Sequence, residues 1–408
     1  MYLMKIIVQK FGGSSVATKE SRKMAIEKII EKYNEGYGIV VVVSAIGRKG
    51  DPYATDTFLD LINQEILDKR DIDLLISCGE IVSSVLLSNE IKERGYNTCV
   101  FTGIQAGILT DNNFGEASIL EINPTSLIES LERGNINIVA GFQGGTNDME
   151  ITTLGRGGSD ISAVALGRAI NCEKVEIFTD VDGVMTGDPN MIPKARLLKT
   201  MSFYEVYQLA KEGAKIIHPK AIEIALENNI PIVIKNTFTN SDGTILKAFN
   251  SSSCKKKEES LRKRLVSSLT YQQNRVQVKI LNNNINKVKE TLEEIVKEKI
   301  SLDFFDLSKN TFVFNVNINN SKRLKKILDN NSLDYEIIPD CSKISIVGKN
   351  LCDNPEALLR ILDVFYHNKI EIFQISASHD SIWCLINQKD LESSLNLIHD
   401  EFKLYEES

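Results

Sequence analysis

The chain has 408 residues, of which 42% are hydrophobic and 25% are charged, and its formal net charge is -7. This length suits two or three domains with sizeable cores, and the composition is that of an ordinary water-soluble globular protein. The acidic balance comes without a basic half or a lysine stripe, which argues against a nucleic-acid partner. No stretch approaches the ~20 apolar residues of a membrane helix, and the N-terminus shows no cleavable signal pattern. We therefore expect a cytoplasmic protein with no membrane partner.

The cysteines and histidines are scattered along the chain. The seven cysteines include no CxxC pair, and the four histidines include no pair at ligand spacing. This distribution favours reduced, structural thiols over a disulfide framework or a zinc site. We expect no metal site built from protein side chains alone.

The first predicted elements are a strand over residues 5–10 and a helix over 20–33. Between them lie Phe11, Gly12 and Gly13. Glycines in such a loop let backbone N–H groups approach a phosphate closely, and Lys10 adds a mobile cation beside it. The spacing fits neither a P-loop nor the GxGxxG of a dinucleotide fold.

The next apolar stretch, residues 39–43, is typical of a strand buried on both faces of a parallel sheet. It ends at Ser44, and ligand-binding residues of open α/β sheets gather at such carboxyl ends. Residues 48–56 are polar and turn-rich and could fold over a substrate. A single helix is predicted over residues 72–91, and the simplest interpretation of Glu80 within it is a surface residue.

Two further strands are predicted at 98–101 and 136–140, and residues 153–160 then place three glycines, Arg156, Ser159 and Asp160 before a helical pattern. A helix N-terminus attracts anions, although a glycine turn with an aspartate cap is the alternative. The strand predicted at 174–178 leads into a polar segment that suits an adenosine and ribose site, or is a plain loop.

The alternation of strands and helices to about residue 247, ending in a strand at 230–234, predicts an α/β protein with a three-layer α/β/α sandwich around a parallel or mostly parallel sheet. A linker rich in Ser, Lys and Glu follows, and after it an internal repeat of about 70 residues. Each copy reads strand, helix, two strands, helix, as in a ferredoxin-like βαββαβ unit. The second copy ends in residues 403–406, which is short for a closing strand, so an exchange of strands between the copies stays open. The expected domains are 1–247, a linker at 248–264, and repeats at 265–337 and 341–408.

Together, these stretches resemble the aspartokinases of the amino-acid kinase superfamily, with two C-terminal ACT domains. The matching stretches run in the family's order over essentially the whole chain: residues 8–16, 42–45, 77–80, 154–160, 178–184 and 213–219. The insert at 47–56 is most similar to that of the stand-alone aspartokinases of sporulating Gram-positive bacteria, which respond to diaminopimelate.

The resemblance implies transfer of the γ-phosphoryl group of ATP to the β-carboxylate of L-aspartate, with Mg²⁺. This is the first step towards lysine, diaminopimelate, threonine and methionine. A carboxylate with an ordinary pKa near ~4 is ionised at neutral pH, so the nucleophile needs no general base. The reaction requires charge neutralisation and alignment instead.

The resemblance also implies roles for individual residues. Lys10 neutralises the transferring phosphoryl oxygens, and Asp160 either orients Lys10 or holds the metal through water. Arg156 receives the α-carboxylate of aspartate, since its planar fork suits that group, and Glu80 receives the α-ammonium. The catalytic residues implied are Lys10, Arg156 and Asp160. The ATP-binding residues implied are Lys10, Phe11, Gly12, Gly13, Ser44, Ser159, Thr179, Asp180, Met185, Thr186, Gly187, Asp188, Pro189, Asn190 and Lys215. The aspartate-binding residues implied are Thr55, Glu80, Arg156, Gly157, Gly158 and Ser159.

Two positions depart from the family pattern. Ser14 stands where many relatives have threonine, which keeps the hydroxyl. The insert before Thr55 leaves an alternative alignment in which Gly50 takes that place.

Regulation is expected through the ACT pair, which would bind diaminopimelate, lysine or threonine and form a homodimer through sheet edges. The expected effector contacts are Asn282, Asn283, Asn284, Asp306, Leu307 and Ser308. Two other interpretations stay open at this point. One is another amino-acid kinase, acting on glutamate, acetylglutamate or a nucleotide, and the other is a non-catalytic amino-acid sensor with a relic kinase domain.

Overall fold

The computed structural model describes residues 4–214, 216–248, 265–281, 285–308 and 311–406. The chain forms two compact units. The N-terminal unit comprises Met1–Val184, Leu197–Ala210 and Lys215–Ser251, and the C-terminal unit comprises Met185–Arg196, Lys211–Ala214 and Ser252–Ser408. Two short segments of the predicted first domain thus belong to the C-terminal unit. None of the helices in the described ranges has the length and hydropathy needed to cross a membrane.

The N-terminal unit is built on an eight-stranded sheet of order β10-β12-β11-β9-β1-β2-β6-β3. All neighbouring pairs are parallel except β11 with β12, which confirms the mostly parallel α/β sandwich. The strands are β1 (Ile6–Phe11), β2 (Gly38–Val43), β3 (Thr98–Phe101), β6 (Ile136–Ala140), β9 (Lys174–Thr179), β10 (Thr200–Ser202), β11 (Ile232–Asn236) and β12 (Thr244–Lys247).

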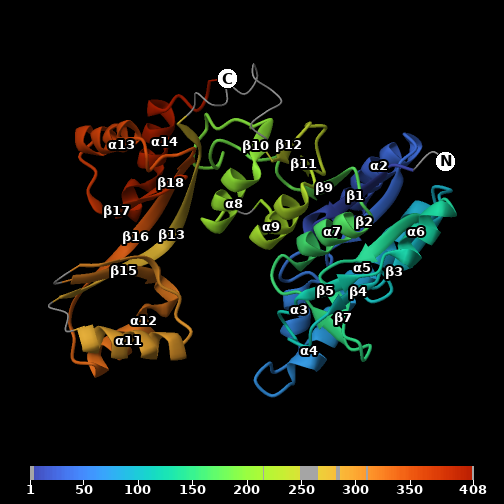
Figure 1. The fold of residues 1–408 in the computed structure, drawn as a ribbon, viewed down its shortest axis with the longest axis horizontal. Coiled ribbons are helices and arrows are strands. Elements are labelled where there is room, and N and C mark those ends of the chain that lie inside the picture. Colours follow the sequence, from blue (N-terminus) through green and yellow to red (C-terminus); the bar gives the residue numbers. More distant parts are fainter. Residues whose placement is uncertain (1–3, 215, 249–264, 282–284, 309–310, 407–408) are drawn as a thin grey trace. The chain divides into compact units, whose positions relative to one another are not determined.

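Helices cover both faces of this sheet (Figure 1). On one face, α2 (Lys19–Asn34) and α5 (Cys78–Lys92) pack apolar side chains against β1 and β2 in one continuous core. On the other, α7 (Gly158–Ala169) packs on β1, β2 and β9 and beside α9 (Pro219–Asn228). Because successive strand residues face opposite sides, Phe11 joins the α2 core while Lys10 faces α7. The other helices in the described part of this unit are α1 (Gly13–Val16), α3 (Thr55–Leu59), α4 (Lys69–Ile76), α6 (Thr125–Glu132) and α8 (Phe203–Lys211).

The helix predicted over 72–91 is wrong in one respect, because α4 ends and α5 begins on either side of Ser77. The Ser77 carbonyl accepts a hydrogen bond at 3.0 Å from Nε2 of Gln143. That side chain belongs to a small sheet, β5-β4-β7-β8, that the sequence analysis did not anticipate. Its strands are β4 (Ile108–Thr110), β5 (Ile119–Ile122), β7 (Gln143–Gly145) and β8 (Ile151–Thr153).

The C-terminal unit contains a six-stranded sheet of order β14-β15-β13-β16-β18-β17, with one hydrophobic core for each ACT repeat. The first repeat adds α11 (Ile285–Lys297), β14 (Asp303–Leu307), β15 (Thr311–Asn317) and α12 (Ser321–Asn330). The second adds α13 (Pro355–His367), β17 (Ile372–Ser378), β18 (Ser381–Asn387) and α14 (Leu391–Glu401).

Two long strands run through both repeats, β13 (Val266–Leu281) and β16 (Asp334–Gly348) (Figure 1). They pair antiparallel from Val266 opposite Gly348 to Leu281 opposite Asp334. Residues 266–272 therefore lie beside the part of β16 that pairs with β18, and they complete the sheet of the second repeat. Residues 402–405 form turns, so the closing strand comes from the start of the first repeat.

Candidate active site

The strand β1 delivers Lys10 and then the glycine loop to the carboxyl edge of the sheet. The rings of Phe11 and Phe178 stack with centroids 4.6 Å apart, and Gly12 N donates to Phe178 O at 3.4 Å. A Cβ on Gly13 would lie 2.4 Å from the Gly47 carbonyl oxygen, so only glycine fits there. The loop is thus held by packing beneath it, with its backbone close to Lys10.

The side chains of Lys10 and Asp160 meet across the sheet and α7. Lys10 Nζ lies 2.8 Å from Asp160 Oδ1, and the two side chains are only 13% and 12% exposed. Asp160 stands in the first turn of α7, and its Oδ2 accepts a hydrogen bond at 3.1 Å from the backbone N–H of His218, just before α9. The Lys10–Asp160 contact is the one that an orienting role for Asp160 requires, and that role stays a prediction.

The glycine-rich stretch before α7 forms the turn that the sequence predicts, directly before the helix. Gly157 has a φ of 71°, and a Cβ there would lie 2.3 Å from the His218 side chain. Ser159 is buried next to Gly141, at the carboxyl end of β6. Arg156 is exposed, and within the described ranges its guanidinium has neither an ion pair nor a hydrogen bond. It is a free cation in the same glycine-rich stretch as Asp160.

Glu80 is buried, so its interpretation as a surface residue is wrong. It is 2% exposed, and Oε1 accepts a hydrogen bond at 3.0 Å from Ala45 N, just after β2. Burial raises the pKa of this carboxyl to about 8, although the Ala45 hydrogen bond opposes the shift. Oε2 has no hydrogen-bond partner in the described part of the chain. A cationic group beside this oxygen would stabilise the ionised form of the carboxyl and supply the missing partner.

The loop after β2 reaches the end of β9. Ser44 N donates to Phe11 O at 3.1 Å, and Thr55 begins α3. Arg48, which the sequence analysis did not select, forms an ion pair with Asp180. The sequence offered one indication of a role for Arg48, its position in the polar insert at residues 47–56.

The other predicted site residues belong to the C-terminal unit or lie outside the described ranges. Residues 185–190 belong to the C-terminal unit, where Thr186 and Gly187 are buried. Asp306 and Leu307 lie in β14, and Ser308 N donates to Thr311 O at 2.9 Å. Lys215, Asn282, Asn283 and Asn284 lie outside the described residues.

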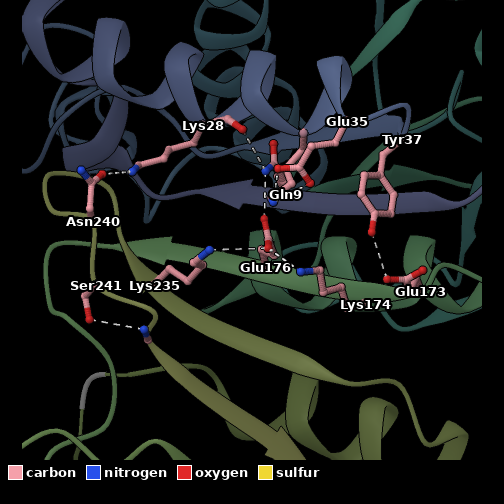
Figure 2. Close-up of polar contacts among 12 residues, drawn as sticks. Gln9, Lys28, Glu35, Tyr37, Glu173, Lys174, Glu176, Lys235, Asn240 and Ser241 are labelled. Carbon is pink, nitrogen blue, oxygen red and sulfur yellow. Dashed lines mark hydrogen bonds and ion pairs between the residues drawn. The ribbon is translucent and has the colours of Figure 1, made fainter.

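Sequence reasoning also missed a buried polar cluster around Glu176, on the face of β1 opposite to Lys10 (Figure 2). Glu176 is fully buried, with Oε2 2.9 Å from Gln9 Nε2 and Oε1 3.0 Å from Lys174 Nζ. Burial alone would raise the pKa of Glu176, but the Gln9 hydrogen bond, Lys235 and Lys174 outweigh it and lower the pKa. Gln9 precedes Lys10, so the cluster ties β1 to β9 next to Lys10. The signal available in the sequence was an acidic residue inside an apolar strand.

Asp73 is a second buried acid that sequence reasoning missed. It is 0% exposed and accepts hydrogen bonds from Thr153 N and Thr153 Oγ1, both at 2.8 Å, and from Gly115 N at 2.9 Å. These bonds fix α4 to β8, the strand that runs into the glycine turn.

Known protein families match most of the chain. The Amino acid kinase family matches residues 5–236, and an ACT domain matches residues 336–400. Aspartokinase 1 of Bacillus subtilis is 39% identical over 405 residues, covering 98% of this chain and all of that protein.

Solved structures of aspartokinase III from E. coli share the fold. The complex with aspartate and ADP (R-state) superposes with a TM-score of 0.75 at 21% identity, covering 97% of this chain and 99% of that one. The complex with lysine and aspartate (T-state) gives a TM-score of 0.78 at 21% identity, covering 98% and 100%. From its sequence relatives and its matched domains, the chain belongs to the aspartokinase family.

Proposed function

We propose that this protein transfers the γ-phosphoryl group of ATP to the β-carboxylate of L-aspartate and forms 4-phospho-L-aspartate. The observation that carries the proposal is the Lys10–Asp160 pair, which sets an oriented cation beside the glycine loop and the N-terminus of α7. Two anionic reactants need such a site, since their mutual repulsion must be neutralised while they are aligned.

The aspartate would be recognised by both ends of its amino-acid backbone. Arg156 offers a free guanidinium for the α-carboxylate. Glu80 offers an unpartnered carboxyl oxygen, and the α-ammonium beside it would favour the ionised form of that carboxyl. Gly157, Gly158 and Ser159 would line the same end of α7, and Thr55 would contact the substrate from its loop. The β-carboxylate is then left free to attack.

The nucleotide would be held at Lys10 and the adjoining loops. Lys10, Gly12 and Gly13 would contact its phosphates, with Ser44, Thr179 and Asp180 at neighbouring strand ends. Residues 185–190 and Lys215 complete the proposed contacts by resemblance. Within the described ranges, no group of three His, Cys, Asp or Glu side chains could hold a metal ion. Mg²⁺ would be held chiefly through phosphate oxygens and water, and it would neutralise phosphate charge.

The relatives favour aspartate over the alternative substrates. The curated relative is named an aspartokinase, and one solved neighbour is a complex with aspartate and ADP. A relic sensor would not need to keep Lys10, Arg156 and Asp160, and all three are present.

Regulation by an end product is part of the proposal. A neighbour is described as a complex with lysine and aspartate, and the second repeat matches the ACT domain. The effector would be diaminopimelate, lysine or threonine, bound near residues 282–284 and 306–308. The outer strands β14 and β17 are candidate edges for a homodimer. Titration of each amino acid against activity identifies the effector, and the mass in solution tests the dimer.

An assay with ATP, Mg²⁺ and aspartate, with hydroxylamine trapping of the acyl phosphate, tests the reaction. The variant Lys10→Met should lose at least about 100-fold in kcat, by analogy with the loss of an oxyanion donor. Lys5→Met is the matched control, because Lys5 is exposed and pairs with Glu173 before β1 begins. Trapped hydroxamate from glutamate but not from aspartate would contradict the proposed substrate.

A further inference from the structure

The segment Met185–Arg196 follows the kinase strand β9 and its loop in the chain but folds as part of the C-terminal unit. Its base is buried, with Thr186 at 0% and Ile192 at 1% exposed, and Ile192 lies in the core of the second ACT repeat. Pro189 and Asn190 at its tip are exposed. The conformation of the exposed tip is therefore set by what packs beneath it.

Hydrogen bonds from two ACT elements fix this base. From β13, Leu269 N donates to Thr186 O at 3.0 Å, and Ser268 Oγ donates to Met185 O at 2.8 Å. From α14, His399 Nε2 lies 2.9 Å from Thr186 Oγ1, with both side chains buried. The loop is thus an integral part of the second repeat.

Asp188 connects the base to the tip. Its Oδ1 accepts a hydrogen bond at 2.9 Å from Asn190 N, which closes the turn. Its Oδ2 accepts one at 2.9 Å from the hydroxyl of Tyr271, on β13. Burial first, and then the bond to Asp188, raise the pKa of Tyr271 to about 12, so the phenol is a protonated donor at neutral pH. One ACT hydroxyl thus holds the carboxylate that shapes the tip.

We propose that Tyr271 is a positioning residue for the nucleotide, which acts by holding Asp188 so that the loop tip keeps its ATP-binding conformation. This inference rests on the proposed function, which assigns residues 185–190 to ATP. The proposed aspartate contacts lie outside this loop. Loss of the Tyr271 hydroxyl should therefore affect one substrate and spare the other.

The test is steady-state kinetics of Tyr271→Phe in the full-length protein. We expect the KM for ATP to rise about 3- to 10-fold, the size of effect that the loss of one ordinary hydrogen bond produces. The KM for aspartate, and kcat at saturating ATP, should stay within about twofold. Tyr335→Phe is the matched control, because it removes a tyrosine–aspartate bond to Asp329 in the first repeat. A rise in both KM values, or an equal rise in the control, would overturn the inference.

A double-mutant cycle adds a readout that a general loss of stability would not reproduce. Asp188→Ala should raise the KM for ATP by itself, and Tyr271→Phe should then add less than about twofold, because its partner is gone. Full additivity would show that the two residues act independently and would also overturn the inference.

Calorimetric titration with ADP separates this inference from the proposed function. If the wild-type protein phosphorylates aspartate but Tyr271→Phe binds ADP as well as wild type does, the inference fails alone. If wild type phosphorylates no aspartate, the proposed function fails, and ADP binding still decides the inference. Weaker ADP binding by Tyr271→Phe than by Tyr335→Phe supports it, and equal binding refutes it.

Discussion

Glu80 combines almost complete burial with a carboxylate oxygen that has no partner in the described ranges. Its pKa is raised to about 8, chiefly by burial. At pH values between the ordinary pKa of a carboxyl and about 8, Glu80 keeps a proton in the folded protein that it releases in the unfolded chain. The ligand-free protein should therefore lose stability as pH rises through this window.

The variant Glu80→Gln tests this behaviour, since it keeps the acceptor for Ala45 N and removes the titration. Its free energy of unfolding should exceed that of wild type by an amount that grows by on the order of 1 kcal/mol per pH unit between roughly pH 5 and pH 8. Urea unfolding at several pH values without substrate measures it. Glu93→Gln, at the exposed end of α5, is the control. Parallel stability curves for wild type and Glu80→Gln would mean that Glu80 is ionised throughout.

Gly157 has two separate reasons to be glycine, a φ of 71° and the His218 side chain 2.3 Å from where a Cβ would stand. Gly36 has a φ of 91° and nothing within 4 Å, so Gly36→Ala isolates the backbone strain. We expect Gly36→Ala to cost about 1 kcal/mol. Gly157→Ala should cost more and should lower kcat, because it displaces His218 from Asp160. Thermal unfolding and the hydroxamate assay measure the two effects, and equal losses in both variants would contradict the packing argument.

At the level of elements, α4 and β8 depend on one buried side chain. Replacing Asp73 leaves the amides of Gly115 and Thr153 without their acceptor. Asp73→Ala should therefore cost roughly 2 to 4 kcal/mol and raise the KM for aspartate, since β8 leads into the turn that carries Arg156. Asp71→Ala removes a half-exposed side chain from the same helix and should leave stability and the KM for aspartate nearly unchanged. Denaturant unfolding and the KM for aspartate are measured for both variants. An unchanged KM in Asp73→Ala would show that β8 does not influence aspartate binding.

The elements also show what a sequence can predict. The central strands and α7 were predictable because continuous apolar stretches and glycine-rich strand ends are local signals. The break at Ser77 and the burial of Glu80 depend on Gln143 and Ala45, which are distant in the chain. The four-stranded sheet was missed because its strands are three or four residues long and carry little periodicity. Lys10 and Asp160 were selected from separate motifs, but only the fold brings their side chains together.

At the scale of the whole molecule, β13 and β16 join the two ACT repeats into one sheet. Trp383, the only tryptophan of the chain, lies in β18 of the second repeat and reports on its unfolding by fluorescence. Phe314→Ala removes a fully buried ring from the core of the first repeat. It should cost about 3 to 5 kcal/mol and shift the Trp383 transition to lower urea, because the repeats unfold together. Phe365→Ala, in the core of the second repeat, is the positive control. A Trp383 transition that moves with Phe365→Ala but not with Phe314→Ala would show that the repeats unfold separately.

The shared strands also limit how such a protein can be recombined with its relatives. Consider a chimera in which everything after a cut between residues 337 and 341 comes from a relative. Its second repeat would be complete in sequence, but residues 266–272, which complete the sheet of that repeat, would come from the other parent. Exchange of regulatory specificity should therefore succeed only when residues 265–406 move as one cassette, together with Met185–Arg196, whose Ile192 fills the same core.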